Sequence, residues 1–317
     1  MEILVLGGTS FVGRAIVDRA LGLGYGVTLF SRGQTGAGLF PAVPRRLGDR
    51  STGDYASLSD GTFDAVVDVS GYVPRHVQQA HAALSGRVGR YLFISTGSVY
   101  DRSQAAGDGM TEDTPRLVPE RGTEEIDGDT YGPLKVACED DVTSFWGDAG
   151  TIVRPGIVAG PWDPTDRFTW WVRRAARGGR VALPGRPDQP VQVVDSRDLA
   201  QLVVQLLEDD RPGSYNAVGP VEPVTLAELV RACAVSAGAE VEVVAIDQSL
   251  AELPLVLPDP SWDVMFRRSA SRALEVGLGR TSLAQTAADV RAWDVERGEP
   301  VLAQELTPDR EAELVGS

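Results

Sequence analysis

Short apolar runs alternate with stretches of helical periodicity along the first half of the chain. Apolar residues in 11–23 recur at helical spacing, and a second helix is predicted from Tyr131 to about Trp146, where Gly147 favours its end. Five apolar runs have the length and composition of buried strands: Ile3–Leu6, Val27–Phe30, Ala65–Val69, Tyr91–Ser95 and Thr151–Arg154. Buried strands that alternate with helices through short connections predict an α/β fold with a doubly wound parallel sheet, covered by helices on both faces.

The pattern changes near residue 158, where short strands, proline-rich loops and further helices follow. One helix is predicted to start at 163–166, where an aspartate suits the N-cap and the proline after it suits the first helical position; another is predicted over Leu226–Ala237. Two segments, Leu199–Leu207 and Tyr215–Val218, have the pattern of elements that return to the first sheet. We therefore predict a sheet domain and a smaller, interleaved C-terminal domain. The first comprises 1–157 with 193–218 returning to it, and the second comprises 158–192 and 219–317.

The composition narrows the class of protein. Forty-five acidic against thirty basic residues give a net charge of −15, which disfavours nucleic acid and anionic membranes as partners. Cys138 and Cys233 are too few for a disulfide framework, and His76 and His81 have no obvious carboxylate partner for a metal site. No apolar run approaches the roughly 18 residues that span a bilayer, and the N-terminal run is too short for an export signal. We therefore expect a cytoplasmic protein with no metal, no nucleic-acid partner and no membrane partner.

A glycine-rich segment joins the first strand to the first helix. Glycines at such a turn let the backbone approach a pyrophosphate, which then lies at the positively polarised N-terminus of the helix. The spacing of Gly7, Ser10 and Gly13 is a variant of the Gly-x-x-Gly-x-x-Gly pattern with serine in the middle. Such a segment is often only a turn, but before the first helix of a doubly wound sheet it favours a dinucleotide. The candidate contacts are Gly7, Thr9, Ser10, Phe11, Val12 and Gly13.

The ends of the next two strands bear on which dinucleotide binds. An acidic residue after the second strand would bind the ribose 2′-hydroxyl of NAD, whereas an arginine suits the 2′-phosphate of NADP. The chain has Ser31 and Arg32 there and no acid, so NADP is preferred over NAD, with a solvated loop arginine as the alternative. After a third strand, Asp49 is placed to accept a hydrogen bond from the adenine amine, and Arg50 either stacks on the ring or points to water.

One residue type is almost missing from the chain. Twenty-nine of the thirty basic residues are arginines, and Lys135 is the single lysine. A drift toward arginine would spare lysine where a compact ammonium is needed. Lys135 follows Tyr131 by four residues, so the two share one helical face, and an ammonium near a phenol favours the phenolate needed for acid–base catalysis. This spacing also arises by accident on surface helices, but the position of the single lysine favours function.

The glycine-rich turn, the Ser/Thr-rich strand end at 95–98 and the Tyr131–Lys135 pair together resemble the short-chain dehydrogenase/reductase superfamily. The chain is similar to its extended branch, the NAD-dependent epimerase/dehydratase family, over most of residues 1–220. This resemblance implies a Rossmann fold in which Tyr131 is the acid–base catalyst, Lys135 assists it and holds the nicotinamide ribose, and Thr96 orients the reacting oxygen. Ser95 and Ser98 are alternatives to Thr96. The further cofactor contacts that it implies are Ser70, Gly71, Pro155, Gly156 and Ile157, besides Tyr131 and Lys135.

Two departures from the family bear on the reaction. The dehydratases carry an acidic pair where this chain has Gly97 and Ser98, which disfavours sugar 4,6-dehydration. Sugar-nucleotide epimerases usually hold the substrate diphosphate with an asparagine and an arginine, near the positions of Gly156 and Val191. We therefore expect an NAD(P)-dependent oxidoreductase, monomeric or homodimeric, that moves hydride between nicotinamide and a carbonyl or secondary alcohol of a small-molecule substrate. An NAD(P)-dependent epimerase of a sugar or sugar nucleotide is the alternative, and a non-catalytic nucleotide-sensing or RNA-associated protein is a more distant one.

Two further features have open roles. Trp162, Trp170 and Trp171 either line a substrate pocket or pack a helix against the rest of the fold, and packing is favoured. The segment 101–130 carries nine acidic and three basic residues and has no apolar periodicity. A long loop of this kind after a catalytic strand is typical of a lid, here one that would select a cationic substrate, or of a solvated surface.

Overall fold

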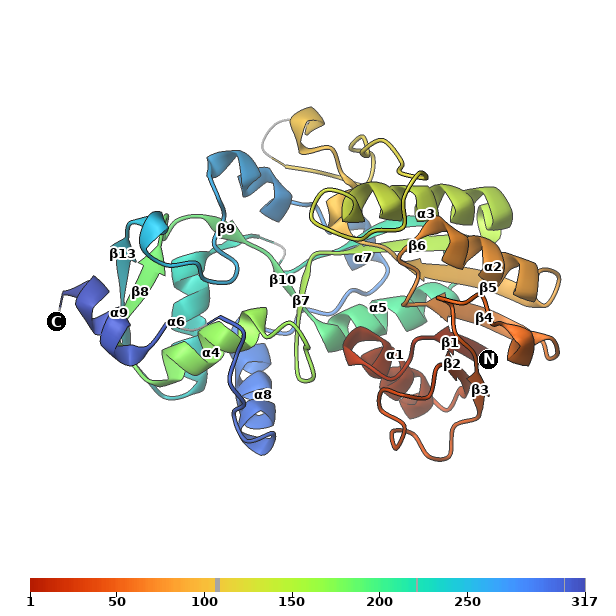
Figure 1. Cartoon of the computed structure of the whole chain (residues 1–317), viewed down its shortest axis with the longest axis horizontal. Helices are drawn as coiled ribbons and strands as arrows, with labels where there is room; N and C mark the ends of the chain where they lie inside the picture. The colour runs from red at the N-terminus through yellow and green to blue at the C-terminus, as the bar shows by residue number, and fades with distance from the viewer. Residues whose placement is uncertain (106–108, 221, 305, 317) are drawn as a thin grey trace. The chain divides into compact units, whose positions relative to one another are not determined.

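The computed structural model describes residues 1–105, 109–220, 222–304 and 306–316, and the chain forms two compact units (Figure 1). Unit 1 comprises Met1–Gly156, Ser196–Ala217 and Ser269–Gly279, and unit 2 comprises Ile157–Asp195, Val218–Arg268 and Arg280–Ser317. These units differ from the predicted domains at two segments and at two boundary residues, Ile157 and Val218, which belong to unit 2. Residues 193–195 belong to unit 2, and 269–279 belong to unit 1.

Unit 1 is built on a seven-stranded parallel sheet with the order β11-β6-β5-β4-β1-β2-β3. Its strands are β1 (Glu2–Leu6), β2 (Gly26–Ser31), β3 (Arg45–Leu47), β4 (Phe63–Asp68), β5 (Val88–Ile94), β6 (Gly150–Pro155) and β11 (Gly213–Ala217). The five strands expected from apolar runs are all present, and the predicted doubly wound fold is confirmed. The chain reverses its direction of travel across the sheet between β1 and β4, and ligands of such sheets bind beyond the carboxyl ends of the strands at this point.

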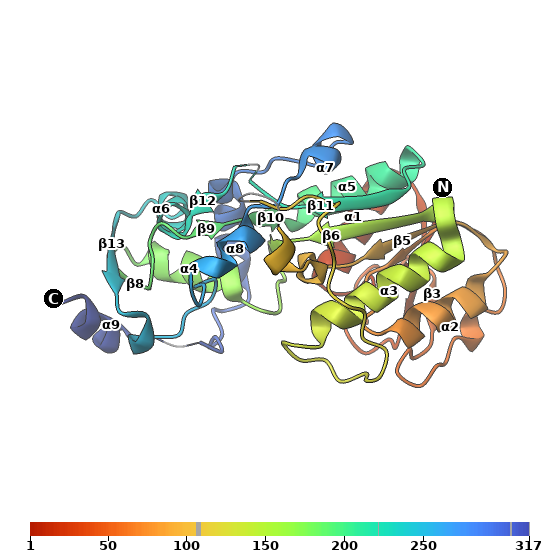
Figure 2. The same cartoon turned by 90° about the horizontal axis from the view of Figure 1, so that it is seen from above.

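Helices cover both faces of this sheet. Helices α1 (Phe11–Gly22) and α5 (Ser196–Glu208) contact each other on one face, and α2 (Pro74–Leu84) and α3 (Tyr131–Trp146) do so on the other (Figure 2). The short α7 (Ser271–Glu275) contacts β11, which is why its segment belongs to unit 1. Short 3-10 helices of this unit lie at Ala56–Leu58, Gly97–Val99, Arg102–Gln104 and Gly147–Ala149.

Unit 2 combines helices with short two-stranded sheets. Parallel pairs form between β7 (Ile157–Ala159) and β10 (Val193–Asp195) and between β8 (Gly179–Pro184) and β13 (Val241–Ile246), and an antiparallel pair between β9 (Pro190–Val191) and β12 (Val224–Thr225). Its helices are α4 (Arg167–Ala176), α6 (Leu226–Ser236), α8 (Leu283–Glu296) and α9 (Pro308–Val315), with 3-10 turns at Gln248–Leu250 and Pro260–Phe266. Helices α4, α6 and α8 contact one another around an apolar core. In the described part of the chain, no helix is long and apolar enough to cross a membrane.

Two of the three clustered tryptophans belong to the core of unit 2. Trp171 is fully buried, and its indole N–H donates to the Pro254 carbonyl at 2.7 Å. Trp170 meets it edge-on, with 4.7 Å between ring centroids, and donates to the Gln304 carbonyl at 3.1 Å. Both therefore pack α4 into the unit, as favoured from the sequence, whereas Trp162 is 42% exposed.

Helix α4 begins later than the sequence predicts. The Asp163 carboxylate accepts hydrogen bonds from the backbone and hydroxyl of Thr165, at 2.9 and 2.7 Å, and so closes a turn instead of capping a helix. Asp166 follows with φ +54°, a left-handed conformation that interrupts any helix started at residue 164. The helix therefore starts at Arg167.

Candidate active site

The turn between β1 and α1 has the geometry of a phosphate-binding loop. Gly7 has φ +97°, and a Cβ on it would lie 2.9 Å from the Cβ and Oγ of Ser70. A Cβ on Gly13 would lie 2.2 Å from the Gly7 carbonyl oxygen, so the turn and helix approach too closely for a side chain. Ser10 precedes α1 in an extended conformation, and its side chain makes no capping hydrogen bond within the described residues, which leaves N–H groups of the first helical turn for an anion. These residues fit a dinucleotide pyrophosphate. The other predicted contacts of the turn, Thr9, Phe11 and Val12, lie in the same segment.

The predicted adenosine-binding residues lie at the neighbouring strand ends. Ser31 is the last residue of β2, and its Oγ accepts a hydrogen bond from the backbone N–H of Gly33 at 3.3 Å. Arg32 is exposed beside it. Hydrogen bonds from Ser51, with a smaller contribution from the Arg32 guanidinium, hold the pKa of Asp49 below its ordinary value. A positive and a negative side chain thus lie near each other beyond β2 and β3, on one side of the glycine-rich turn.

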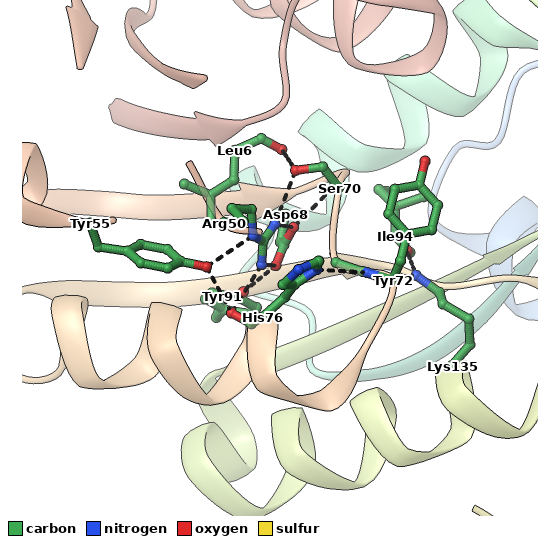
Figure 3. A network of polar contacts seen from close by, with 11 residues as sticks. Leu6, Arg50, Tyr55, Asp68, Ser70, Tyr72, His76, Tyr91, Ile94 and Lys135 are labelled. Carbon is green, nitrogen blue, oxygen red and sulfur yellow. Dashed lines mark hydrogen bonds and ion pairs between the residues drawn. The ribbon is translucent and has the colours of Figure 1, made fainter. Parts of the chain in front are cut away.

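Arg50 corrects the sequence prediction. Its side chain is buried, with the residue 8% exposed, and it forms a bidentate ion pair with Asp68 at N···O distances of 2.5 and 2.8 Å (Figure 3). Its remaining N–H groups donate to the hydroxyls of Tyr55 and Ser70 and to the His76 carbonyl, each at 3.0 Å. A guanidinium held on all sides inside the protein neither stacks on adenine nor points to water. Arg50 points into the protein because it pairs with the fully buried carboxylate of Asp68 at the end of β4.

The hydroxyl groups after β5 are not equivalent. Ser95 is buried, and its Oγ donates to the Glu139 carboxylate at 2.6 Å, away from any substrate. Thr96 is half-buried, and its Oγ1 accepts from the Ser98 backbone N–H at 3.1 Å and lies 3.3 Å from the Ser98 hydroxyl. Ser95 is thereby excluded as the group that orients a substrate oxygen. Thr96 and its alternative, Ser98, both keep a hydroxyl at this turn.

Helix α3 brings the predicted catalytic pair to the same turn. It begins at Tyr131, which is half-buried, as predicted from the helical spacing. A Cβ on Gly132 would lie 2.4 Å from the carbonyl oxygen of Ser98, so glycine lets the start of α3 pack directly on the backbone that carries the candidate hydroxyls. The backbone at the start of α3, which carries Tyr131, is therefore packed against the turn that carries Thr96 and Ser98.

Lys135 is buried one helical turn further along. The residue is 2% exposed, and its Nζ donates to the carbonyls of Gly71 at 2.7 Å and Ile94 at 2.8 Å. The ammonium also lies 4.0 Å from the centroid of the Phe93 ring. Burial lowers the pKa of Lys135 from 10.5 to about 8, so the ammonium form still predominates at neutral pH. These contacts hold a positive charge at the carboxyl ends of β4 and β5.

The last predicted cofactor contacts follow β6. Pro155 ends this strand, and the backbone N–H of Gly156 donates to the Ala217 carbonyl at 3.0 Å. Ile157 is the first residue of unit 2. Their contact with a nicotinamide stays a prediction.

A second buried charge cluster was missed by the sequence analysis. Glu139 is fully buried on α3, four residues after Lys135, and pairs with the Arg154 guanidinium at 2.7 and 2.9 Å and with Arg116 at 3.0 Å. Arg154 also donates to the Tyr100 hydroxyl at 2.9 Å. The spacing of Glu139 and Lys135 on one helical face was the available signal, whereas the arginine partners come from β6 and from the segment 101–130.

The acidic segment 101–130 is attached to the rest of unit 1 by ion pairs. Glu124 pairs with Arg75 on α2 at 2.6 Å, and Asp113 pairs with Arg272 on α7 at 2.5 Å. Residues 106–108 of the segment lie outside the described residues. These pairings use carboxylates that a lid selecting a cationic substrate would need.

The two cysteine side chains lie inside the protein. Cys138 and Cys233 are both buried, and burial raises the pKa of the Cys138 thiol to about 12. Among the residues that the structure describes, no three His, Cys, Asp or Glu side chains gather in a way that would hold a metal ion.

Comparison with known proteins agrees with the motif analysis. A model of the NAD dependent epimerase/dehydratase family matches residues 3–218. Among curated proteins, the chain is 26% identical over 254 residues to the chloroplast stem-loop binding protein of 41 kDa b of Arabidopsis thaliana. The match covers 75% of this chain but only 63% of that protein, so the chain spans less than two thirds of this relative.

Several solved structures share the fold. A putative epimerase from Burkholderia cenocepacia J2315 superposes with a TM-score of 0.70 at 21% identity, covering 93% of this chain and 98% of its own. A UDP-glucose 4-epimerase gives 0.73 at 18% identity, covering 95% and 99%. The UDP-glucuronic acid 4-epimerase from Bacillus cereus in complex with NAD gives 0.70 at 16% identity, covering 96% and 99%. The resemblance inferred from the sequence motifs is confirmed by the family match.

Proposed function

Because the chain belongs to the NAD dependent epimerase/dehydratase family of enzymes, we propose that it is an NAD(P)-dependent oxidoreductase acting on a carbonyl or secondary alcohol of a small molecule. The observation that carries this proposal is the start of α3. Gly132 packs on the Ser98 carbonyl, and the single lysine of the chain is buried one turn behind Tyr131. Burying an ammonium is costly, and buried ionisable groups with shifted pKa values are concentrated at functional sites.

Each residue has a defined task in this proposal. The Tyr131 hydroxyl gives a proton to the substrate oxygen in reduction and takes it back in oxidation. Thr96, with Ser98 as the alternative, donates a hydrogen bond to the same oxygen. The Lys135 ammonium stabilises the phenolate form of Tyr131 by its charge. The turn Gly7–Gly13 would hold the pyrophosphate of the dinucleotide, and bound nicotinamide supplies the hydride acceptor or donor.

We also propose that NADP is preferred over NAD. The support for this is the exposed Arg32 next to Ser31 at the end of β2. The sequence has no acidic residue directly after this strand that would bind the ribose 2′-hydroxyl of NAD. The Bacillus cereus neighbour is in complex with NAD, so binding must be measured for both dinucleotides.

The test of the reaction is a screen of carbonyl compounds with NADPH or NADH, followed by the absorbance of reduced nicotinamide, with Tyr131→Phe as the inactive control. We expect stoichiometric oxidation of the dinucleotide by at least one class of carbonyl. A sugar-nucleotide epimerase must keep its ketone intermediate bound, usually through the substrate diphosphate. Near the positions that bind the diphosphate in such enzymes, Gly156 has no side chain and Val191 is fully buried. Isomerisation of a UDP- or dTDP-sugar without net change in nicotinamide absorbance would establish the epimerase instead.

We propose a small-molecule substrate, rather than nucleic acid or a membrane, and a reducing cytoplasm as the place of action. The net charge of −15 and the two buried thiols support this assignment. Retention of a stem-loop RNA at physiological salt, together with no binding of either dinucleotide, would instead place the chain beside its stem-loop binding relative in function. Light scattering decides between a monomer and a homodimer.

A further inference from the structure

The Arg50–Asp68 ion pair is costly to keep inside the protein and has no part in the mechanism above. Asp68 is fully buried at the end of β4. Besides Arg50, its carboxylate accepts a hydrogen bond from the Tyr91 hydroxyl at 2.5 Å. Burial by itself would raise the pKa of Asp68, but the charge and hydrogen bonds of Arg50, together with the Tyr91 hydrogen bond and the Lys135 charge, hold the pKa below its ordinary range. Buried ion pairs seldom add stability over apolar residues of similar size, so another use is the better explanation.

The pair fixes the backbone that follows β4. Asp68 accepts a hydrogen bond from the backbone N–H of Ser70 at 3.1 Å, and Arg50 donates to the Ser70 hydroxyl at 3.0 Å (Figure 3). The same hydroxyl donates to the Leu6 carbonyl at 3.1 Å. Ser70 therefore lies against Gly7, the first residue of the glycine-rich turn, where a Cβ would come within 2.9 Å of the Ser70 side chain.

The next residue connects the pair to Lys135. A Cβ on Gly71 would lie 2.7 Å from the Phe93 ring and 3.0 Å from the Asp68 carboxylate, so Gly71 is wedged between them. In this position its carbonyl oxygen accepts the hydrogen bond from Lys135 Nζ. The Arg50–Asp68 pair thus fixes Ser70 and Gly71, of which Ser70 contacts the dinucleotide turn and Gly71 binds the lysine ammonium.

We propose that Arg50 and Asp68 are positioning residues that hold Ser70 and Gly71 in place, and thereby align the dinucleotide turn with the Lys135 ammonium. The catalytic role of Lys135 rests on the proposed function. The position of its ammonium is independent of that function, because it follows from the hydrogen bonds to the Gly71 and Ile94 carbonyls. Neither Arg50 nor Asp68 is expected to touch substrate or dinucleotide.

The charges around Lys135 define what a change in the pair should do. Burial is the main influence on the pKa of Lys135 and lowers it, and the Arg50 charge adds a smaller effect in the same direction. Asp68 and Glu139 oppose this lowering, as does any thiolate at Cys138. Replacement of Asp68 by asparagine removes an attractive charge and leaves the Arg50 charge uncompensated. Both effects lower the pKa of Lys135.

The experiment uses the single lysine as its probe. In tag-free protein labelled with ¹³C,¹⁵N-lysine, the side chain gives one resonance, whose position and titration report on Lys135 alone. We expect Asp68→Asn to displace this resonance, to lower the pKa of Lys135 by about one pH unit, and to weaken dinucleotide binding about tenfold. In the double variant Arg50→Gln/Asp68→Asn, which leaves no unpaired charge, we expect the resonance to stay displaced and binding to stay weak, while the pKa returns toward the wild-type value.

The matched control is Asp210→Asn. Asp210 pairs with the buried Arg90 at 2.6 Å, at the opposite end of β5, and its left-handed backbone (φ +53°) suits asparagine as well as aspartate. This variant should leave the lysine resonance and dinucleotide affinity unchanged.

Two results would overturn the proposal. One is a folded Asp68→Asn or double variant with wild-type lysine resonance and wild-type dinucleotide affinity. The other is a double variant that does not fold, because the pair would then serve stability alone. A wild-type protein that binds neither dinucleotide would refute the proposed function, while the lysine resonance would still test the positioning of Lys135.

Discussion

Replacing Gly132 with alanine should impair catalysis far more than it impairs folding. The new Cβ would lie 2.4 Å from the Ser98 carbonyl oxygen and 3.0 Å from the Leu117 side chain, whereas real Cβ atoms are essentially never found closer than 3.0 Å. The start of α3 and the backbone of Ser98 must therefore separate by about 0.6 Å or more. This displacement shifts Tyr131 relative to Thr96, and an error approaching 1 Å at a reacting group costs about 100-fold in rate.

The same substitution has a stability cost of the kind known for overpacking, about 1–3 kcal/mol. Urea unfolding measures this cost, and turnover of the carbonyl substrate at saturating dinucleotide measures the catalytic effect. Gly128→Ala is the matched control, because a Cβ at this nearby position meets no atom within 4 Å in the described structure and the backbone needs no positive φ. Gly132→Ala protein with kcat within twofold of wild type would show that the contact between α3 and Ser98 does not position Tyr131.

Three further outcomes are expected. Lys135→Arg keeps the charge but cannot place a compact ammonium between the Gly71 and Ile94 carbonyls, so kcat should fall about 100-fold or more with the fold intact by circular dichroism; near-normal turnover would make the single lysine an accident. Arg32→Ala should weaken NADP binding by about 1–3 kcal/mol in calorimetry and leave NAD binding nearly unchanged, and equal loss for both would remove the role of Arg32 in recognising the 2′-phosphate. Burial lowers the pKa of Lys135 from 10.5 to about 8, so between these pH values the unfolded state binds more protons than the folded state. As pH rises through this window, the free energy of unfolding of wild type should therefore increase by up to roughly 3 kcal/mol relative to that of Lys135→Met. A difference in urea unfolding that does not depend on pH would contradict the burial of a charged lysine.

What the sequence predicts well are features encoded within one segment. The apolar runs identify the strands, and the four-residue spacing of Tyr131 and Lys135 places both on one face of α3. The glycines of residues 7–13 identify the turn, because Gly7 has a positive φ and Gly13 approaches the Gly7 carbonyl too closely for a side chain. Each of these inferences needs only local geometry.

What the sequence misses are pairings between distant segments. Arg50 looks like a surface residue because its partner, Asp68, lies eighteen positions away at the end of another strand. Ser95 and Thr96 are adjacent hydroxyls in sequence, and only the buried Glu139 on α3 shows which one is turned inward. The delayed start of α4 has a local cause, but the sequence does not show that Asp166 takes a left-handed conformation.

The burial of Lys135 has a consequence for labelling chemistry. Apart from the N-terminus, the chain has a single primary amine, and the residue that carries it is 2% exposed. Acylating reagents that react with the neutral amine can reach it only when α3 and the end of β5 separate transiently. The rate of its modification therefore measures the local opening of the site in a protein that needs no engineered label. A bound dinucleotide that closes the site should slow this rate by the same factor by which it suppresses the opening.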